Sequence, residues 1–535
     1  MIPKTKERIY AEELLINKEL THTEIAKLIH KKYKRLPVET IRATVRRASG
    51  NHGQIGREKG KLNPENIREK NFKILFPKEY SDAKKRKLTK SKYYIITSAQ
   101  NNTSLHRDFW DNIKAYSKFL NAEIHVILNR YKNPTSVFTD ALSEKWDSEI
   151  LPYSDAKRHH IHKHLVLMSD IKIQPTASLP LTGMEGLSGL NSCIFGHPKV
   201  QFKVIPALEG YEPKMMFTTG SVTKANYTDS KAGKKGEFHH TFGFCIVEIK
   251  DNDTFFIRQV TALQNGSFTD LCYNIKYSKV TKINRIDVAV LGDIHVGDDC
   301  KVVNAQQRKW LNYFKPKHTV LHDIFNGHSI NHHEEKDPIK QYRRELDGSN
   351  DLSREINDMN AWLKSMLKYN LVLASSNHTD WLDRYIRSND WKKNIKNALI
   401  YVECAKIALS GKAPKGLIGY FVSKEFGDKV KVIGRDESFK FNEWELAQHG
   451  DVGGNGSKGS ISQYRRLSTK LICGHSHSPS RQDGLLYVGT STKLRVGFNV
   501  GASSWLNCDV IVHKDRKAQH IIYQGEEKEF TTFKF

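Results

Sequence analysis

The stretch Ile286-Asp-Val-Ala-Val-Leu-Gly-Asp-Ile-His295 decides the fold of the C-terminal half of this chain. Its apolar residues, 286–291, predict a buried strand, and Asp293 and His295 follow that strand at once. The apolar body of such a strand anchors the backbone, so the loop at its carboxyl end can aim polar side chains into a crevice. The stretch therefore predicts one wall of a polar site at the edge of an α/β sheet.

Four further motifs follow predicted strands in the same way. The strands are 319–321, 371–374, 444–447 and 470–473, and the motifs are His322-Asp323 with Asn326-Gly327, Asn377-His378, His449-Gly450-Asp451 and Gly474-His475-Ser476-His477. One such motif alone is usually surface polarity, but five in order predict a two-metal site. Helices expected at 304–314, 352–369 and 381–398 alternate with the first strands. After residue 416 we expect mainly strands, including one at Phe421-Val422.

These residue types suit the hydrolysis of phosphate esters. The reaction needs a strong nucleophile near neutral pH and neutralisation of the charge on the phosphate oxygens. Two divalent cations about 3.5–4 Å apart supply both, because they activate a water molecule and clamp the phosphate. Mixed carboxylate, imidazole and amide ligands suit manganese, iron or zinc, and magnesium less well. We therefore expect two divalent ions, with Mn²⁺ first and Mg²⁺, Fe²⁺ or Zn²⁺ as alternatives.

The order of the motifs resembles the calcineurin-like metallophosphoesterase superfamily, whose motifs run D-x-H, G-D-x-x-D/N, G-N-H-D/E, a lone H and G-H-x-H. The resemblance covers residues 285–515 and implies a four-layer α/β/β/α sandwich in the C-terminal half. It also implies the metal ligands: Asp293, His295 and His477 for the first ion, Asp323 as the bridge, and Asn377, His449 and His475 for the second ion.

The same resemblance gives roles to residues beside the ligands. His378 would stabilise the transition state or protonate the leaving oxygen. Asn326 would steady its loop and the neighbouring ligands. The chain departs from the pattern at His322, which replaces a glycine, and at Thr379, which stands where the family has Asp or Glu. His322 would either crowd the mouth of the site or act behind the ligands.

Composition points to a polyanionic partner. The 535 residues carry a formal net charge of +26, and residues 1–90 alone hold 24 Lys+Arg against 11 Asp+Glu. The length predicts two to four domains. No run approaches the roughly 20 apolar residues of a membrane helix, and the N-terminus lacks a signal-peptide core. Seven scattered cysteines without a C-x-x-C pair fit a reducing cytoplasm.

Residues 1–50 are predicted to form a basic module that resembles a helix-turn-helix. Thr21 and Glu24 form a capping box that opens one helix, and a second helix follows from Val38. Three arginines lie off the inward face of that second helix: Arg42, Arg46 and Arg47. They predict DNA contact, although a plain structural or oligomerising hairpin remains the alternative. Residues 51–92 are expected to be a basic linker.

Residues 93–283 are predicted to form a mixed α+β domain of unknown role, before a catalytic domain at 284–535. Residues 93–99, 108–120 and 122–127 have the pattern of a strand, a helix and a strand. We expect the lysine- and glycine-rich segment 219–237 to be a mobile loop. The histidines at 159, 160, 162 and 164 are interpreted as ordinary polar residues, because we see no carboxylate or cysteine at a suitable spacing.

The metal motifs alone do not choose among protein phosphatases, cyclic-nucleotide phosphodiesterases, nucleotidases and DNA nucleases. The basic module, the linker and the large extra domain favour a long polyanion, so the first hypothesis is a metal-dependent DNase of the double-strand-break-repair nuclease type. The layout also resembles host-takeover DNases of large tailed phages, which implies action in the cytoplasm of an infected bacterium. The alternatives are a phosphomonoesterase acting on proteins or nucleotides and a DNA-binding regulator with an inactive metal site.

The glycine-rich run after His449, residues 450–459, is expected to be a flexible lid, with Lys458 contacting phosphate. DNA is the expected partner and a membrane is not. The sequence leaves homo-oligomerisation and phage or host protein partners open.

Overall fold

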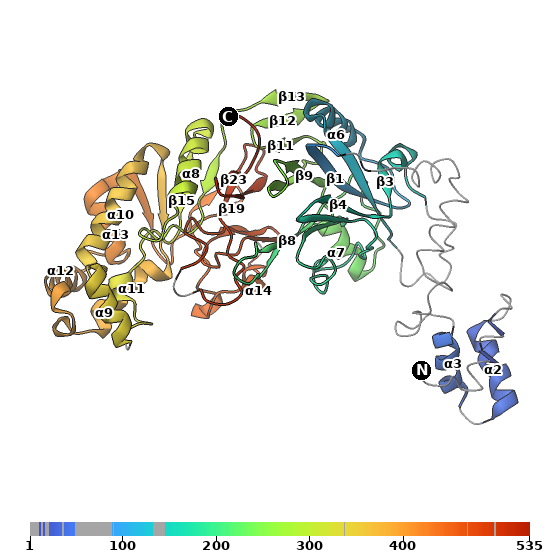
Figure 1. Cartoon of the computed structure of the whole chain (residues 1–535), viewed down its shortest axis with the longest axis horizontal. Helices are drawn as coiled ribbons and strands as arrows, with labels where there is room; N and C mark the ends of the chain where they lie inside the picture. Colours follow the sequence, from blue (N-terminus) through green and yellow to red (C-terminus); the bar gives the residue numbers. More distant parts are fainter. Residues whose placement is uncertain are drawn as a thin grey trace. The chain divides into compact units, whose positions relative to one another are not determined.

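The structure is a computed structural model that describes residues 10–11, 14–15, 21–34, 37–48, 88, 90–131, 145–335, 337–467, 469–496 and 499–535. The chain forms two compact units, residues 1–85 with 136–144 and residues 86–135 with 145–535. Both contain elements labelled in Figure 1. Among the described residues, no helix combines the length and the apolar character that crossing a membrane requires.

The first unit contains a helical hairpin of α2 (His22–Tyr33) and α3 (Val38–Ala48). The predicted capping box is confirmed: the Glu24 carboxylate accepts a hydrogen bond from the Thr21 amide at 2.8 Å, and the Thr21 hydroxyl accepts one from the Glu24 amide. The two helices share a small core formed by Ala11, Ile25, Ala26, Ile29, Ile41 and Val45. Arg42 is partly buried, whereas the side chains of Arg46 and Arg47 and most of the linker 51–92 lie outside the described residues.

A six-stranded sheet carries the first three motifs of the predicted metal site. Its order is β17-β16-β15-β14-β23-β24, with β14 to β17 parallel to one another and β23 antiparallel to both β14 and β24. The bounds are β14 (Val288–Val290), β15 (His318–Leu321), β16 (Leu371–Ala374), β17 (Val430–Ile433), β23 (Cys508–Val512) and β24 (Ala518–Ile522). The strand predicted at 371–374 is therefore confirmed at both ends.

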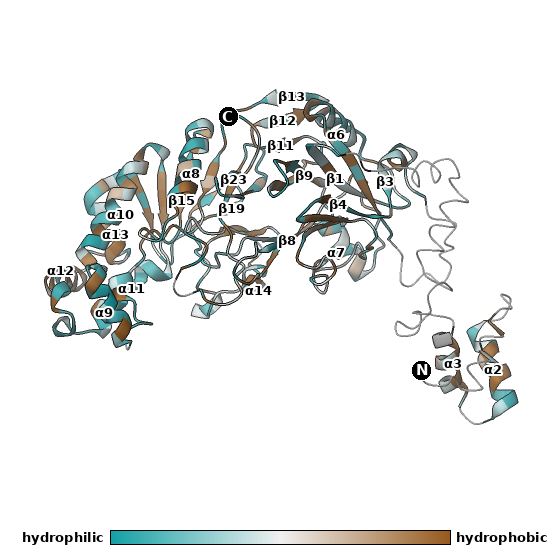
Figure 2. Ribbon diagram, in the orientation of Figure 1, coloured by the Kyte–Doolittle hydropathy of each residue, from teal (hydrophilic) through white to brown (hydrophobic). Residues whose placement is uncertain are grey.

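Both faces of this sheet are buried, as the apolar runs require. One face, represented by Ala289 and Leu373, packs against α8 (Lys301–Phe314), α10 (Leu352–Met366) and α13 (Gly416–Phe426). Figure 2 shows its strands as hydrophobic, whereas helix α11 (Asn377–Ser388) is mainly hydrophilic. The opposite face, represented by Val290 and Val510, packs against Trp444 and other apolar residues of a second sheet.

That second sheet has ten strands in the order β18-β19-β20-β22-β21-β7-β8-β6-β5-β4. The bounds are β4 (Arg158–His162), β5 (Leu165–Met168), β6 (Ser192–Phe195), β7 (Phe202–Ile205), β8 (Lys214–Thr218), β18 (Lys440–Phe441), β19 (Trp444–Glu445), β20 (Lys470–Cys473), β21 (Ser480–Gln482) and β22 (Leu485–Tyr487). It thus contains strands from both sides of the domain boundary expected at 283/284. That division of the chain stays a prediction.

The region 93–283 also builds a five-stranded sheet in the order β10-β9-β1-β2-β3 and a three-stranded sheet in the order β11-β12-β13. The bounds are β1 (Tyr93–Gln100), β2 (Glu123–Asn129), β3 (Ser154–Asp155), β9 (Gly243–Ile249), β10 (Phe255–Thr261), β11 (Phe268–Asp270), β12 (Tyr273–Lys276) and β13 (Lys279–Lys282). β1 and β2 are parallel and joined through α6 (Arg107–Leu120), which confirms the predicted strand–helix–strand unit. The fold as a whole is mixed α/β with several sheets.

The helix expected at 381–398 is wrong as a single element. α11 (Asn377–Ser388) ends first, two short 3-10 turns follow, and α12 (Ala398–Leu409) begins separately. The break lies at Asn389 and Asp390, where the Asp390 carboxylate accepts a hydrogen bond from the Lys392 amide. Asparagine and aspartate side chains compete for backbone hydrogen bonds in this way, which the apolar periodicity does not reveal.

Two further expectations are corrected. Phe421 and Val422, expected in a strand, lie inside α13 (Gly416–Phe426), whose inward face is buried. The segment 219–237, expected to be a mobile loop, contains the start of α7 (Lys231–His239). The Ser230 hydroxyl accepts a hydrogen bond from the Gly233 amide and so caps this helix. Tertiary packing of α13 therefore outweighs the strand-like residues at 421–422. Capping by Ser230 outweighs the loop-like composition of 219–237.

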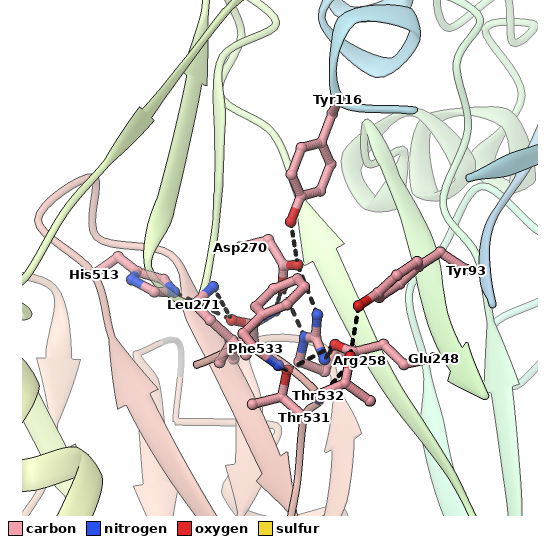
Figure 3. A network of polar contacts seen from close by, with 11 residues as sticks. Tyr93, Tyr116, Glu248, Arg258, Asp270, Leu271, His513, Thr531, Thr532 and Phe533 are labelled. Atoms are coloured by element: carbon pink, nitrogen blue, oxygen red, sulfur yellow. Dashed lines mark hydrogen bonds and ion pairs between the residues drawn. The ribbon is translucent and has the colours of Figure 1, made fainter. Parts of the chain in front are cut away.

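A buried ionic network ties the sheets of the middle region to the C-terminal segment (Figure 3). Arg258 of β10 bonds to both carboxylate oxygens of Asp270 at 2.8 Å and also pairs with Glu248. Glu248 in turn accepts hydrogen bonds from Thr531 and Thr532. Burial disfavours the charge of Asp270, but Arg258 outweighs it and lowers the pKa of that carboxyl.

Replacing Arg258 by methionine should destabilise the protein by about 3–5 kcal/mol, because two buried carboxylates would lose their cation. Lys163→Met is the control, since Lys163 pairs with Asp253 where the side chains are 63% and 70% exposed, and its loss should leave the free energy of unfolding nearly unchanged. Urea unfolding of the two variants measures the difference. Equal losses would show that the network contributes little.

Candidate metal centre

The predicted ligands lie at the ends of strands from both large sheets. Asp293, Asp323 and Asn377 follow β14, β15 and β16, whose carboxyl ends meet at one edge because the strands are parallel. His449 and the Gly474–His477 motif follow β19 and β20 of the ten-stranded sheet. The face-to-face packing of the two sheets brings these loops together.

One cluster contains Asp293, His295, Asp323 and His477, with one potential ligand atom of each lying within 4.8 Å of all the others. The Nε2 atoms of His295 and His477 face each other at 3.1 Å. His477 Nε2 lies 3.1 Å from Asp293 Oδ2, and His295 Nε2 lies 3.5 Å from Asp323 Oδ2. Such separations between nitrogen and oxygen donors match those around a single ion with metal–ligand distances near 2 Å.

A second cluster contains Asp323, His449 and His475. His449 Nε2 lies 3.0 Å from Asp323 Oδ2, and the rings of His449 and His475 lie 5.2 Å apart. Asp323 therefore belongs to both clusters. The sequence had singled out this residue, from the family resemblance, as the bridge between two ions.

Four of these residues have left-handed backbone conformations. The φ angles are +46° at His295, +46° at Asp323, +69° at His475 and +53° at His477. Residues other than glycine rarely adopt this region, and the strain persists where the surrounding structure imposes it. At these positions it turns each side chain toward the common centre, as expected for a site whose geometry serves a ligand.

Several polar atoms of the centre are buried without a hydrogen-bond partner among the described residues. They include one carboxylate oxygen each of Asp293 and Asp323 and the amide oxygen of Asn377. Burying such atoms without a partner is costly, and a bound cation would remove that cost. Gly474 is also required here, because a Cβ at that position would lie 2.2 Å from Asp293 Oδ1. The donor set fits divalent ions.

The electrostatics agree with a cation site. Burial opposes a charge on His449, but Asp323 and Asp293 raise the pKa of its imidazole to about 9. A dication between the same carboxylates would take the place of that proton. Burial and the nearby His378 lower the pKa of His295 to about 3, which keeps this imidazole neutral, as a metal ligand must be.

His378 lies at the edge of the centre and is held from two sides. Its Nδ1 donates a hydrogen bond to the Asn326 carbonyl at 2.7 Å, and its ring stacks on Trp381 with centroids 4.0 Å apart. The ring centroid lies 4.5 Å from that of His295. Sequence reasoning missed Trp381, although its position three residues after His378 on a helix would have placed the two rings on one face.

Two supporting residues lie where the sequence suggested. The Asn326 side chain donates to Asp298 at 2.9 Å, so it fixes the loop that also holds His378. His322 is fully buried, with its ring 5.5 Å from that of His449. It therefore lies behind the ligands rather than at an open mouth.

Arg435 was also missed. It follows the strand predicted at 430–433, at the same sheet edge as the ligands, and that position was the available signal. It donates to the Ser375 carbonyl and pairs with Asp451 and Asp380.

Lys458 is exposed, and an isolated antiparallel bridge pairs it with Val452. The flexible lid expected at residues 450–459 stays a prediction, and so does the contact of Lys458 with phosphate. The same holds for DNA contact by the arginines of α3, which lie in the other unit.

Comparison with known proteins relates the chain to a phage protein. No family model matches it, and no solved structure matches it. It is 30% identical over 454 residues to "Protein A1" of Escherichia phage T5, a match that covers 79% of this chain and 80% of that protein. The expected link to phage proteins is thereby confirmed. The chain belongs to the same protein family as Protein A1 of Escherichia phage T5.

Proposed function

We propose that this protein is a metal-dependent DNase that hydrolyses phosphodiester bonds and degrades DNA in the cytoplasm of a phage-infected bacterium. The observation that carries the proposal is the pair of His/Asp clusters joined by Asp323. A carboxylate shared by two donor sets is what a two-metal phosphoesterase requires. Mn²⁺ is the first candidate, with Mg²⁺, Fe²⁺ or Zn²⁺ as alternatives.

The proposed roles follow from the positions of the side chains. Asp293, His295 and His477 would hold one ion, His449 and His475 the other, and Asp323 both. The family resemblance adds Asn377, whose amide oxygen is buried without a partner, to the second ion. When bound, the two ions would activate the attacking water and neutralise the phosphate oxygens. Because Nδ1 of His378 donates its hydrogen to the Asn326 carbonyl, His378 would give a proton from Nε2 only as the imidazolium, and the ring would return to the neutral form when the leaving oxygen takes that proton.

The layers support membership in the calcineurin-like metallophosphoesterase superfamily. Helices cover one face of the six-stranded sheet, and the ten-stranded sheet covers the other. We propose that these are three of the four layers of an α/β/β/α sandwich.

Charge favours DNA over a small ester. The chain has a net charge of +26, and its N-terminal region is strongly basic. This positive charge would attract a long polyanion. The relationship to a phage protein fits the destruction of DNA during infection.

Purified protein incubated with supercoiled plasmid and Mn²⁺ should nick or degrade the DNA, and EDTA should block the reaction. Agarose gels and p-nitrophenyl phosphate hydrolysis, run in parallel, separate the alternatives. Turnover of the small ester with intact plasmid would favour a phosphomonoesterase. A mobility shift without turnover of either substrate would favour a DNA-binding regulator.

Asp323→Asn should lower nuclease activity at least about 10³-fold, because neither cluster would keep its shared carboxylate. Metal analysis should show weaker binding of both ions. Asp253→Asn is the matched control, because Asp253 is exposed, pairs with Lys163 and belongs to neither cluster. This variant should behave as wild type. Full activity of Asp323→Asn would overturn the assignment of the bridge.

His378→Ala should keep both ions but slow hydrolysis by about 10²–10⁴-fold, the range for a lost proton donor. Steady-state kinetics and metal content, measured on the same sample, test this. His164→Ala removes an exposed histidine and should change neither value. If His378→Ala lost its ions, the residue would serve the ligands rather than the proton transfer.

The triple change Arg42→Gln, Arg46→Gln and Arg47→Gln should weaken DNA binding and flatten its salt dependence. Each lost phosphate contact should reduce the slope of log K against log salt by about 0.9. Fluorescence anisotropy over a salt series measures the slope, while hydrolysis of a small phosphodiester should stay unchanged. An unaltered slope would favour the structural or oligomerising alternative for this module.

A further inference from the structure

A third cluster of potential ligands lies in the middle region and consists of His125, Asp155 and His159. They come from β2, β3 and β4, and one potential ligand atom of each lies within 4.8 Å of the others. His159 Nε2 lies 2.8 and 2.9 Å from the two oxygens of Asp155. The rings of His125 and His159 are 5.4 Å apart and nearly perpendicular, at 69°.

The cluster is closed on the inside and reachable from outside. His125 is 0% exposed and Asp155 6%. The side chain of His159 is 14% exposed, so it stands at the boundary with solvent. An ion could therefore enter past His159 and be surrounded by buried donor atoms. A metal site needs both an entry path and defined ligands.

A neighbouring residue fixes the orientation of His125. Its Nε2 forms a hydrogen bond with Ser169 Oγ at 2.8 Å, just beyond the end of β5. Metal-binding histidines commonly have their second nitrogen held by such a partner, which sets the tautomer and the ring direction. With Nε2 on Ser169, Nδ1 is the atom that would bind an ion.

We propose that His125, Asp155 and His159 bind one divalent transition-metal ion, Zn²⁺ in the first place, at a site separate from the Asp323 centre. Two imidazoles and one carboxylate form a zinc donor set that leaves the fourth position to a water molecule. Mixed nitrogen and oxygen donors without a thiolate also accommodate Co²⁺, which makes the site accessible to spectroscopy.

The ion would join two sheets at their edges. β3 is the last strand of the five-stranded sheet, and β4 is the last strand of the ten-stranded sheet. β3 has only two residues, and only Ala156 and Lys157 separate it from β4. So short an edge strand contributes few hydrogen bonds of its own. A metal bound by β2, β3 and β4 would hold this corner in place, which is a structural role.

This proposal gives His159 a role different from that of an ordinary polar residue, which the sequence indicated. Asp155 stands four residues before His159, but the two residues lie on different short strands, so the spacing alone does not indicate a shared site. The remaining ligand, His125, is 30 positions before Asp155 and is brought close only by the parallel pairing of β2 with β3.

Metal content after dialysis against buffered Zn²⁺ tests the proposal. If the Asp323 centre binds two ions, wild type should hold three per chain, and Asp155→Asn and His159→Gln should each hold two. His160→Gln is the matched control, since His160 is exposed on the same strand, and it should keep three. Nuclease activity should survive in the Asp155 and His159 variants.

The Asp323→Asn background separates this site from the proposed nuclease centre. There, Co²⁺ should still give the visible absorption of a tetrahedral site, and Zn²⁺ should still raise the melting temperature. Adding Asp155→Asn should remove most of both effects and leave only what the weakened Asp323 centre still contributes. No Co²⁺ band in the single variant, or an unchanged band in the double variant, would overturn the proposal whether or not the chain proves to be a DNase.

Discussion

Two carboxylates buried close together, Asp293 and Asp323, impose the constraint on which the C-terminal half depends. Burial of like charges is unfavourable unless cations or donors compensate them. Imidazoles from three loops lie beside these carboxylates, namely His295, His449, and His475 with His477. The two carboxylates raise the pKa of His449 against the effect of burial. Two sheets packed face to face are what bring these loops to one place. The strained backbones at His295 and His477 are sustained by the same packing.

Much of this architecture could be predicted from residue order. Apolar runs gave the strands that precede Asp293, Asp323 and Asn377, because a strand buried on both faces leaves a continuous hydrophobic signature. The capping box of Thr21 and Glu24 could also be predicted from the sequence. The break after α11 was not, because it depends on side chain to backbone bonds at Asn389 and Asp390 that compete locally with helix formation.

The surroundings of the site were harder to predict than the ligands. Trp381 and Arg435 act through stacking and ion pairing, which have no fixed motif, although both lie beside predicted elements. His322 could be noticed as a departure but not placed, since its burial depends on the approach of Gly474 from the other sheet. The cluster around Asp155 required a parallel pairing between strands that sequence periodicity does not specify.

The ten-stranded sheet has a practical consequence for anyone dissecting this chain into fragments. β21 of the C-terminal half pairs with β7 of the middle region through Arg481 and Phe202. A fragment that begins near residue 284 would leave the backbone groups of β21 that face β7 unpaired. Such an exposed strand edge promotes aggregation. Recombinant expression of the C-terminal half therefore requires the middle region in the same polypeptide.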